Sequence, residues 1–267
     1  GVDSVGPRLL SYRQNGGSLM KKGLSGNGLK LIAIAAMTLD HAAWWLFPGY
    51  PRAALPLFLH LIGRLTCPIM CFFVAEGYHY TRDVRKYTRR LFLFALISHF
   101  AYRFASADFS GLRFFLPFGD GNLLNQTSVM WALAWGLVML RIAESSRIRQ
   151  GWVRIILIFL VCLAAFPSDW SCIASLCILA FGTNRGNLKA QAGWMIFYVA
   201  IYAAVYSLAI DPVYGLLQMG VVLAIPLLAC YNGRRSNRSG NGSGMKWLFY
   251  IYYPLHLALI GLAQYFS

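Results

Sequence analysis

The sequence predicts an all-α, polytopic integral membrane bundle of about nine transmembrane helices. Of the 267 residues, 58% are apolar and only 12% are charged, and the mean hydropathy is +0.54, so a soluble domain is a poor explanation. The apolar residues form long runs separated by short loops. A net charge of +15 in a soluble protein would suggest nucleic acid. Here the basic residues lie in the loops, which indicates membrane topology and argues against a nucleic-acid partner.

The apolar runs predict the spans in chain order. The first two, 29–47 and 54–77, are separated by a Pro-Gly-Tyr-Pro turn, and Arg64 and Pro68 interrupt the second. The basic segment 81–90 is expected to be a loop. The remaining spans follow at 91–106, 127–141, 155–167, 170–182, 191–210, 213–231 and 247–265. The spans 155–167 and 170–182 are short and meet at Pro167-Ser168-Asp169, so one re-entrant hairpin is the alternative to two separate helices.

The distribution of Lys and Arg predicts a cytoplasmic N-terminus and an extracytoplasmic C-terminus. On that orientation 20 of the 24 basic residues are cytoplasmic, Arg52, Arg103 and Arg113 lie outside, and Arg64 lies within the membrane. We expect residues 1–28 to be a polar cytoplasmic tail, part of which could be a non-native remnant, and 29–267 to be a single transmembrane domain. No cleavable signal peptide is visible.

The cysteines are expected to be free thiols packed as small apolar side chains. All of them lie in apolar runs, and their spacings lack the companion ligands that a zinc site needs. The sequence therefore predicts no metal, and no cysteine is placed for a covalent acyl-enzyme. They are Cys67, Cys71, Cys162, Cys172, Cys177 and Cys230.

The first span carries the leading candidates for chemistry, Asp40 and His41. At about 1.5 Å per helical residue, His41 lies roughly 16 Å along the axis from Lys30, about half of the hydrocarbon thickness. Ionisable groups at that depth are costly and usually face a partner or a pathway. Because an imidazole titrates near neutral pH, His41 is a candidate general base. The alternative is that Asp40 and His41 only clamp helices together.

Arg64 needs a carboxylate, because an unpaired guanidinium inside a span is very costly. Neighbours on a helix point about 100° apart, so Asp40 is expected to pair with another helix rather than with His41. Glu76 lies about 18 Å further along the span from Arg64 and is a poor partner. We therefore expect an Asp40–Arg64 pair, which could also be purely structural.

The last span places His256 about nine residues in, close to the depth of His41, so that the two histidines could share a polar cavity. A purely structural histidine is an equal alternative. Tyr253, three residues before it, is a candidate substrate-binding residue. Outside, the loop from Gly119 to Ser128 offers amide and hydroxyl groups, with Asn125 and Ser128 as candidate substrate-binding residues, although such loops usually only form turns.

A cytoplasmic basic surface is the candidate donor site. The segment 81–90 carries five positive charges, which could anchor the chain on anionic lipid or bind the phosphates of a donor such as a CoA thioester. No glycine-rich nucleotide loop accompanies it. The candidate cofactor-binding residues are Lys30, Glu76, Arg82, Arg85, Lys86, Arg89, Arg90, Tyr231 and Asn232.

Taken together, these motifs resemble the TraX family of integral membrane proteins, named for the conjugative pilin acetylase. The resemblance runs from Lys30 to His256. The first span is also similar to membrane O-acyltransferases, in which ten residues separate a basic residue from a histidine, here Lys30 and His41. The chain departs from the family at Ser98-His99-Phe100, which leaves the acceptor open. The matching pieces are LDH at Leu39–His41, GR-x-x-x-P at Gly63–Pro68, EGY at Glu76–Tyr78, TR at Thr81–Arg82, RRLFLFALIS at Arg89–Ser98, N-x-x-S-V-M from Asn125, YNG at Tyr231–Gly233 and FYIYYPLHL from Phe249.

The resemblance implies a multi-pass acetyltransferase of the bacterial inner membrane with acetyl-CoA as donor. The implied acceptor is the N-terminal amine of a pilin-like exported protein, or alternatively a surface glycan or lipid. In this interpretation His41 is the base, Asp40 and Arg64 fix the polar core, and His256 binds substrate or stabilises the oxyanion. A proton-coupled transporter and a structural partner of a pilus machine stay open, although the sequence shows no inverted repeat and no paired helix breaks.

Overall fold

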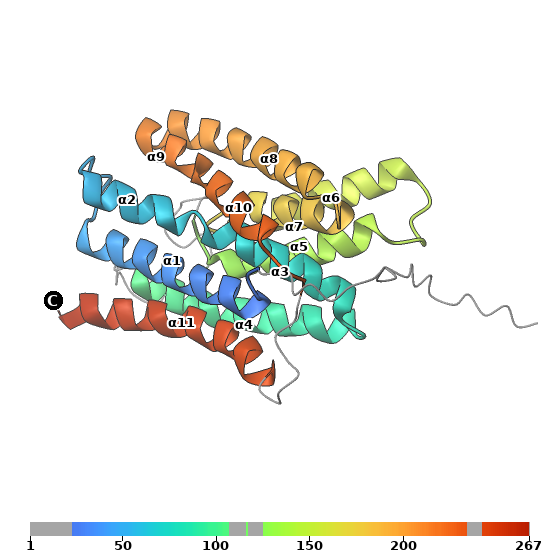
Figure 1. Cartoon of the computed structure of the whole chain (residues 1–267), viewed down its shortest axis with the longest axis horizontal. Helices are drawn as coiled ribbons and strands as arrows, with labels where there is room; N and C mark the ends of the chain where they lie inside the picture. Colours follow the sequence, from blue (N-terminus) through green and yellow to red (C-terminus); the bar gives the residue numbers. More distant parts are fainter. Residues whose placement is uncertain (1–22, 107–115, 117–124, 234–241, 267) are drawn as a thin grey trace, which may run out of the picture.

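The chain folds into an all-helical bundle in the computed structural model, which describes residues 23–106, 116, 125–233 and 242–266 (Figure 1). Within those residues the only β-type pairings are two isolated bridges, Leu24 with Tyr231 and Thr127 with Ser168. The helical elements are α1 Gly26–Leu46, α2 Ala54–Gly63, α3 Thr66–Tyr80, α4 Val84–Ala105, α5 Val129–Ala143, α6 Gly151–Ala165, α7 Ile173–Thr183, α8 Leu188–Ala209, α9 Pro212–Leu217, the 3-10 helix η2 Gln218–Leu223, α10 Ala224–Ala229 and α11 Gly242–Phe266.

Among the residues that the structure describes, four helical segments have the length and apolar composition to cross a membrane. They are Gly26–Leu46, Ala54–Tyr80, Leu188–Ala209 and Pro212–Ala229, and the shorter helices α5, α6 and α7 are apolar as well. Long apolar segments of this kind characterise a multi-pass membrane protein. Each predicted span overlaps one described helix or one run of consecutive helices.

Three expectations about the helices need correction or completion. The segment 81–90 is not a loop throughout, because α4 begins at Val84, where the Asp83 side chain accepts a hydrogen bond from the Lys86 N–H and caps the helix. The eighth span is interrupted by η2, between α9 and α10. The fifth and sixth spans are two separate helices rather than a packed hairpin, because α7 packs mainly against α3, α5 and α8.

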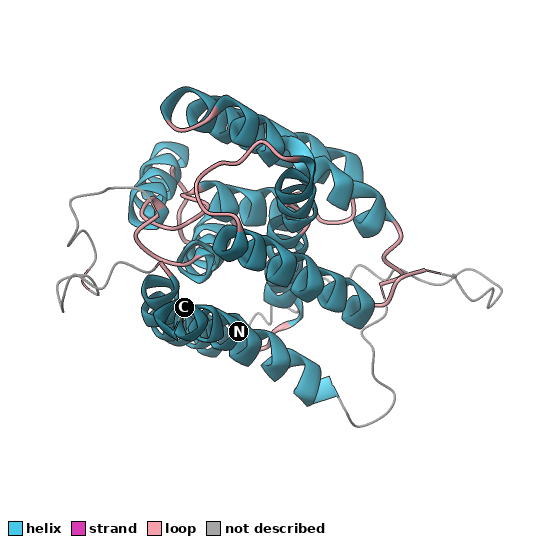
Figure 2. Ribbon diagram, turned by 90° about the vertical axis from the view of Figure 1, so that its left-hand side faces the viewer, coloured by secondary structure: helices cyan, strands magenta, loops and turns pink. Residues whose placement is uncertain are grey.

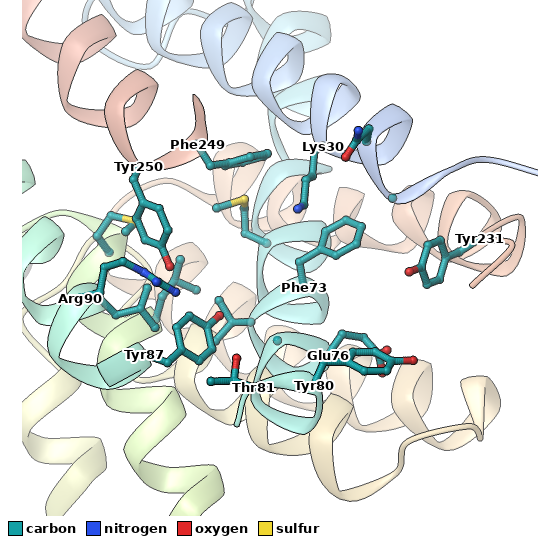
Figure 3. Close-up of a pocket in the computed structure, with 18 of the residues that line it drawn as sticks. Lys30, Phe73, Glu76, Tyr80, Thr81, Tyr87, Arg90, Tyr231, Phe249 and Tyr250 are labelled. Carbon is teal, nitrogen blue, oxygen red and sulfur yellow. The ribbon is translucent and has the colours of Figure 1, made fainter. Parts of the chain in front are cut away.

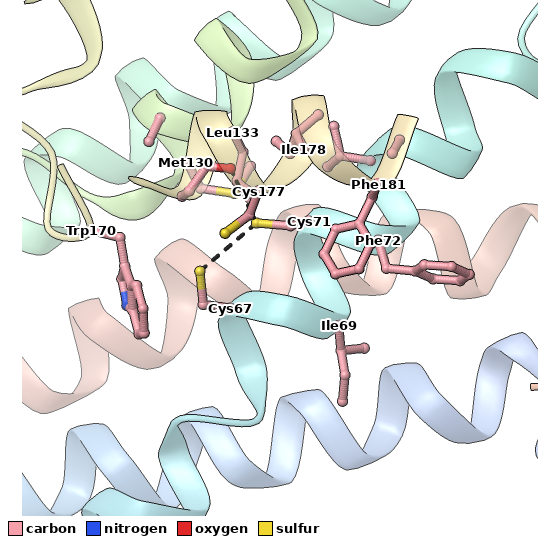
Figure 4. Close-up of a cluster of buried hydrophobic side chains, with 14 of the residues drawn as sticks. Cys67, Ile69, Cys71, Phe72, Met130, Leu133, Trp170, Cys177, Ile178 and Phe181 are labelled. Carbon is pink, nitrogen blue, oxygen red and sulfur yellow. Dashed lines mark hydrogen bonds between the residues drawn. The ribbon is translucent and has the colours of Figure 1, made fainter. Parts of the chain in front are cut away.

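The short helix α7 lies at the centre of the bundle, and α1, α4 and α11 form a layer on one side (Figures 1 and 2). Small and apolar side chains of α3, α5 and α7 meet in the core (Figure 4). Cys67, Cys71 and Cys177 are buried there as free thiols, with the Cys67 and Cys71 sulfurs 3.8 Å apart. This core holds the helices that carry the polar residues described next.

Candidate functional site

A buried ion pair joins α1 to the break between α2 and α3. The Arg64 Nη2 donates to Asp40 Oδ2 at 2.6 Å, and Arg64 Nη1 donates to Gln218 Oε1 at 2.8 Å. His60, one turn before Arg64, places its Nδ1 2.7 Å from Asp40 Oδ1. Because a carboxylate only accepts, His60 Nδ1 is the donor. The predicted Asp40–Arg64 pair is thus confirmed, and both oxygens of Asp40 are engaged.

Two glycines allow these groups to meet. A Cβ on Gly63 would lie 2.4 Å from the Cβ and Cγ of Asp40, so only glycine permits α1 to approach α2 this closely. A Cβ on Gly220 would lie 2.6 Å from Leu61 and 3.2 Å from the Arg64 Cγ. The two helix interruptions, at Arg64–Leu65 and at η2, therefore face each other across the polar cluster.

His41 and His256 form a second polar contact, between α1 and α11. His41 Nδ1 lies 2.6 Å from His256 Nε2, and His256 Nδ1 lies 2.9 Å from the Tyr252 carbonyl oxygen. A carbonyl only accepts, so in the neutral rings His256 Nδ1 carries a proton and its Nε2 accepts from His41 Nδ1. This leaves the lone pair of His41 on Nε2. The arrangement fixes His41 as a potential base with its orientation set by His256.

Tyr253 and Ser128 come together beside the histidine pair. Tyr253 is 2% exposed, and its ring centroid lies 6.4 Å from that of His41 and 5.5 Å from that of His256. Ser128 precedes the first residue of α5 and is completely buried. The Ser128 hydroxyl and the Val129 N–H are neighbours of the Tyr253 phenol oxygen. Asn125, three residues earlier, is exposed and adopts a φ of 53°.

A pocket of about 640 Å³ opens at the end of the bundle where α1 and α4 begin and α3 ends (Figure 3). Its walls are aromatic and basic, and its inner end is apolar. Tyr250, one helical turn before Tyr253 on α11, lines it. The pocket thus reaches to within one turn of the residues beside the histidine pair. The lining residues labelled in Figure 3 are Lys30, Phe73, Glu76, Tyr80, Thr81, Tyr87, Arg90, Tyr231, Phe249 and Tyr250.

The charges in the pocket wall are predominantly positive. The Arg90 guanidinium carbon lies 5.3 Å from the Tyr87 ring centroid and 5.2 Å from that of Tyr250, and Lys30 Nζ lies 5.1 Å from that of Phe73. No carboxylate pairs with Arg90 among the residues that the structure describes. Aromatic faces hold both cations in place.

Glu76 is the carboxylate of the pocket wall, and Arg185 neutralises it. Arg185 Nε donates to Glu76 Oε1 at 2.8 Å and its Nη2 donates to Oε2 at 3.4 Å. This hydrogen bond raises the pKa of Arg185, which lies in the loop between α7 and α8. Since the pair cancels its own charge, an anion in the pocket meets Arg90, Lys30 and Arg82 without opposition from Glu76.

Most of the predicted site residues gather in these two places. Asp40, His41, Arg64, His256, Ser128 and Tyr253 lie around the mid-bundle cluster, and Lys30, Glu76, Arg82, Arg90 and Tyr231 line the pocket. Four predicted cofactor residues do not line it: Arg85, Lys86 and Arg89 are exposed on α4, and Asn232 donates to the Gly23 carbonyl at 3.1 Å. The part of the predicted loop at 119–124 lies outside the described residues. Within the described part of the chain, no group of three or more metal-binding side chains occurs.

Several residues of the two places were not predicted, and three of them, His60, Gln218 and Arg185, hydrogen-bond to predicted residues. His60 lies four residues before Arg64, on the same helical face, and this spacing could have identified it. Gln218 is a single polar residue inside an apolar run, and Arg185 lies in a polar loop after Asn184. Nothing in the sequence connects them to Arg64 or Glu76. Their roles depend on how distant helices pack.

Comparison with known proteins gives two matches. Residues 25–264 match the family described as TraX protein. A relative from Dichelobacter nodosus, described as "Probable fimbrial assembly protein FimC, serogroup H1", is 33% identical over 252 residues, which is 89% of this chain and 95% of the relative. No solved structure matches the chain.

Proposed function

The chain belongs to the TraX family, and from this premise we propose that it is a membrane-embedded acetyltransferase. It moves an acetyl group from cytoplasmic acetyl-CoA to an acceptor at or across the membrane. The observation that carries the proposal is the basic, aromatic pocket that ends one helical turn short of the residues beside the His41–His256 pair. We orient the pocket toward the cytoplasm, where the sequence places most basic residues.

The pocket suits a CoA thioester in charge and in shape. Arg90 and Lys30 offer donors to phosphate oxygens, and the neighbouring tyrosines and phenylalanines offer faces for the adenine ring. A volume of about 640 Å³ lies within the range of small-molecule sites. The apolar inner end would take the uncharged pantetheine arm, so that the thioester lies toward Tyr253 and His41.

His41 accepts the proton of the attacking group in this mechanism. Its Nδ1–H is held by His256, so Nε2 is the free basic atom. The acceptor nitrogen or oxygen attacks the thioester carbonyl carbon, gives its proton to His41, and CoA leaves as the thiol after taking that proton. Asp40 and Arg64 hold α1 against the α2–α3 break and so fix the depth of His41.

The acceptor we favour is the N-terminal amine of a pilin-like exported protein. The relative from D. nodosus carries a fimbrial name, and an amine of a membrane-inserted subunit could approach the α1–α11 contact from the bilayer. O-acetylation of a surface glycan or lipid is the alternative, since the same base would deprotonate a hydroxyl.

One observation favours a transporter as the second candidate. Two interrupted helices, α2–α3 and α9–η2–α10, meet at the Arg64–Gln218 contact, contrary to the expectation that no paired breaks exist. Broken helices at mid-membrane often bind ions in carriers. Uptake of an ion or substrate by proteoliposomes without any acetyl transfer would favour this candidate.

The test is acetyl transfer by purified wild-type and His41→Ala protein, each inserted in lipid nanodiscs. Loss of the base is expected to reduce kcat by about 10²- to 10⁴-fold or more, with unchanged CoA binding and thermal stability. His79→Ala is the matched control, because His79 contacts Gly182 O at the end of α3 and does not line the pocket. Full activity of His41→Ala would contradict the mechanism.

A further inference from the structure

Two buried hydroxyl groups meet beside the N-terminus of α5, that of Ser128 and that of Tyr253 from α11. Tyr253 OH and Ser128 Oγ each lack a well-formed hydrogen-bond partner among the described residues, although both are buried. A buried hydroxyl without a partner costs about 1–3 kcal/mol. Two such groups side by side, from α11 and from the start of α5, indicate a ligand atom that accepts hydrogen bonds between them.

The helix end itself adds positive potential at the same point. Ser128 is the N-cap of α5, a helix of 15 residues, but its side chain makes no capping hydrogen bond. The N–H groups of a first helical turn are unsatisfied within the helix and carry the positive end of its dipole. The Val129 N–H, the first of them, is a neighbour of the Tyr253 phenol.

The position of the Tyr253 and Ser128 hydroxyls suits the carbonyl group of the bound thioester. Met130, the second residue of α5, lines the inner wall of the pocket, and Tyr250 lines it one turn before Tyr253. On the other side, the Tyr253 ring contacts the rings of His41 and His256 edge-on. The two hydroxyls therefore lie between the pocket and the base.

We infer that Tyr253, Ser128 and the N-terminus of α5 form the oxyanion site of the acetyl transfer. This inference rests on the proposed function. When the acceptor attacks, the carbonyl π electrons move to oxygen, and the resulting oxyanion accepts hydrogen bonds from Tyr253 OH, Ser128 OH and the helix N–H groups. When the C–S bond breaks, the electron pair returns to the carbonyl, and the thiolate takes the proton that His41 received.

Among the described residues, the carboxyl group of Asp169 lies near enough to interact electrostatically with this site. The Asp169 carboxylate, on the turn between α6 and α7, acts on Tyr253 electrostatically. It also faces the Arg64 guanidinium, which offsets its charge. In this proposal the oxyanion is stabilised by the hydroxyl and N–H donors and by the helix end, not by a nearby cation. His256 then has the separate role of orienting His41.

The experiment compares wild type with Tyr253→Phe and Ser128→Ala in nanodiscs, with acetyl-CoA and an amine-bearing peptide. Losing one oxyanion donor is expected to lower kcat by about 10²- to 10³-fold, most strongly for Tyr253→Phe, while the Kd for free CoA stays unchanged and the Tm does not fall. A purely structural phenol would not separate kcat from CoA binding in this way. Tyr206→Phe is the matched control, because its hydroxyl donates to Tyr50 OH, away from the site.

The results distinguish the failure of the oxyanion site from the failure of the acetyltransferase proposal. Wild-type kcat in Tyr253→Phe, or an equal loss in Tyr206→Phe, overturns the oxyanion site and leaves the acetyltransferase proposal in place. A wild-type chain that neither binds CoA nor transfers acetyl groups overturns both.

Discussion

Replacing Arg90 with methionine tests the donor pocket most quantitatively. Methionine keeps an unbranched apolar stem beside the Tyr87 and Tyr250 rings but removes the guanidinium that lies over them, and with it the charge. A hydrogen bond from a charged group contributes about 1.5–3 kcal/mol. At 1.4 kcal/mol per tenfold change in Kd, the loss corresponds to roughly 10- to 100-fold weaker CoA binding.

The assay is calorimetry with two ligands on the purified chain. CoA carries the phosphates and is expected to bind the Arg90→Met protein more weakly, whereas pantetheine lacks them and is expected to bind both proteins equally. The salt dependence of CoA binding is also expected to be smaller in the variant, since one screened charge pair is missing.

Arg147→Met is the matched control, because it removes one exposed arginine from the loop between α5 and α6. The reasoning is refuted if Arg90→Met binds CoA as tightly as wild type, or if it weakens pantetheine to the same extent. The first result would mean that the phosphates lie elsewhere, and the second that the substitution disturbs the pocket as a whole.

The remaining predictions concern packing and charge balance. Gly63→Ala brings a methyl group against Asp40 and is expected to lower the free energy of unfolding by about 1–3 kcal/mol. Gly193→Ala places its methyl group in open space on α8 and is expected to raise it by about 0.5–1 kcal/mol. Equal Tm shifts in the two variants would refute the close approach of α1 and α2. Asp40→Asn removes the carboxylate that is hydrogen-bonded to the buried Arg64 guanidinium and is expected to cost about 3–5 kcal/mol, measured as a large loss of Tm. Arg185→Ala is expected to weaken CoA binding by exposing the Glu76 charge, and the added Glu76→Gln substitution is expected to restore it; no restoration would exclude this charge balance.

The sequence predicted contacts of the candidate site where one energetic cost dominated, that of an ionisable group inside a membrane span. An arginine inside an apolar span needs a carboxylate, and Asp40 lay at a compatible depth, so the Arg64–Asp40 pair could be predicted before the fold was known. The matching depth of His41 and His256 likewise follows from counting residues along two helices. Neither inference needed the packing of the bundle.

Other features depend on three-dimensional packing. A run of charges resembled a loop, but the cap at Asp83 makes the segment from Val84 helical. The 3-10 helix Gln218–Leu223 has no breaker at its start, and the close approach of Gly220 to Arg64 and Leu61 is visible only in the structure. Residues joined by tertiary contacts alone, such as Arg185 and Glu76, leave no local signal.

The pairing of Tyr253 with Ser128 shows the same limit at the candidate site. Both were expected to bind substrate, but their contact depends on where α5 begins relative to α11. Hydropathy predicts that both helices exist and does not predict their relative depth. The start of α5 beside the phenol is what distinguishes an oxyanion site from two separate polar residues.

The central claim is that this chain transfers an acetyl group from acetyl-CoA. The most direct measurement supplies labelled acetyl-CoA to the purified wild-type protein in nanodiscs, together with a peptide that carries the N-terminal sequence of a pilin-like protein. Mass spectrometry measures the acetylated peptide, and a thiol assay measures the CoA that is released. The account predicts equal amounts of the two products, and formation of both slowed by about 10²- to 10⁴-fold or more with His41→Ala. CoA that binds without release or transfer, or the same product yield with His41→Ala, would contradict it.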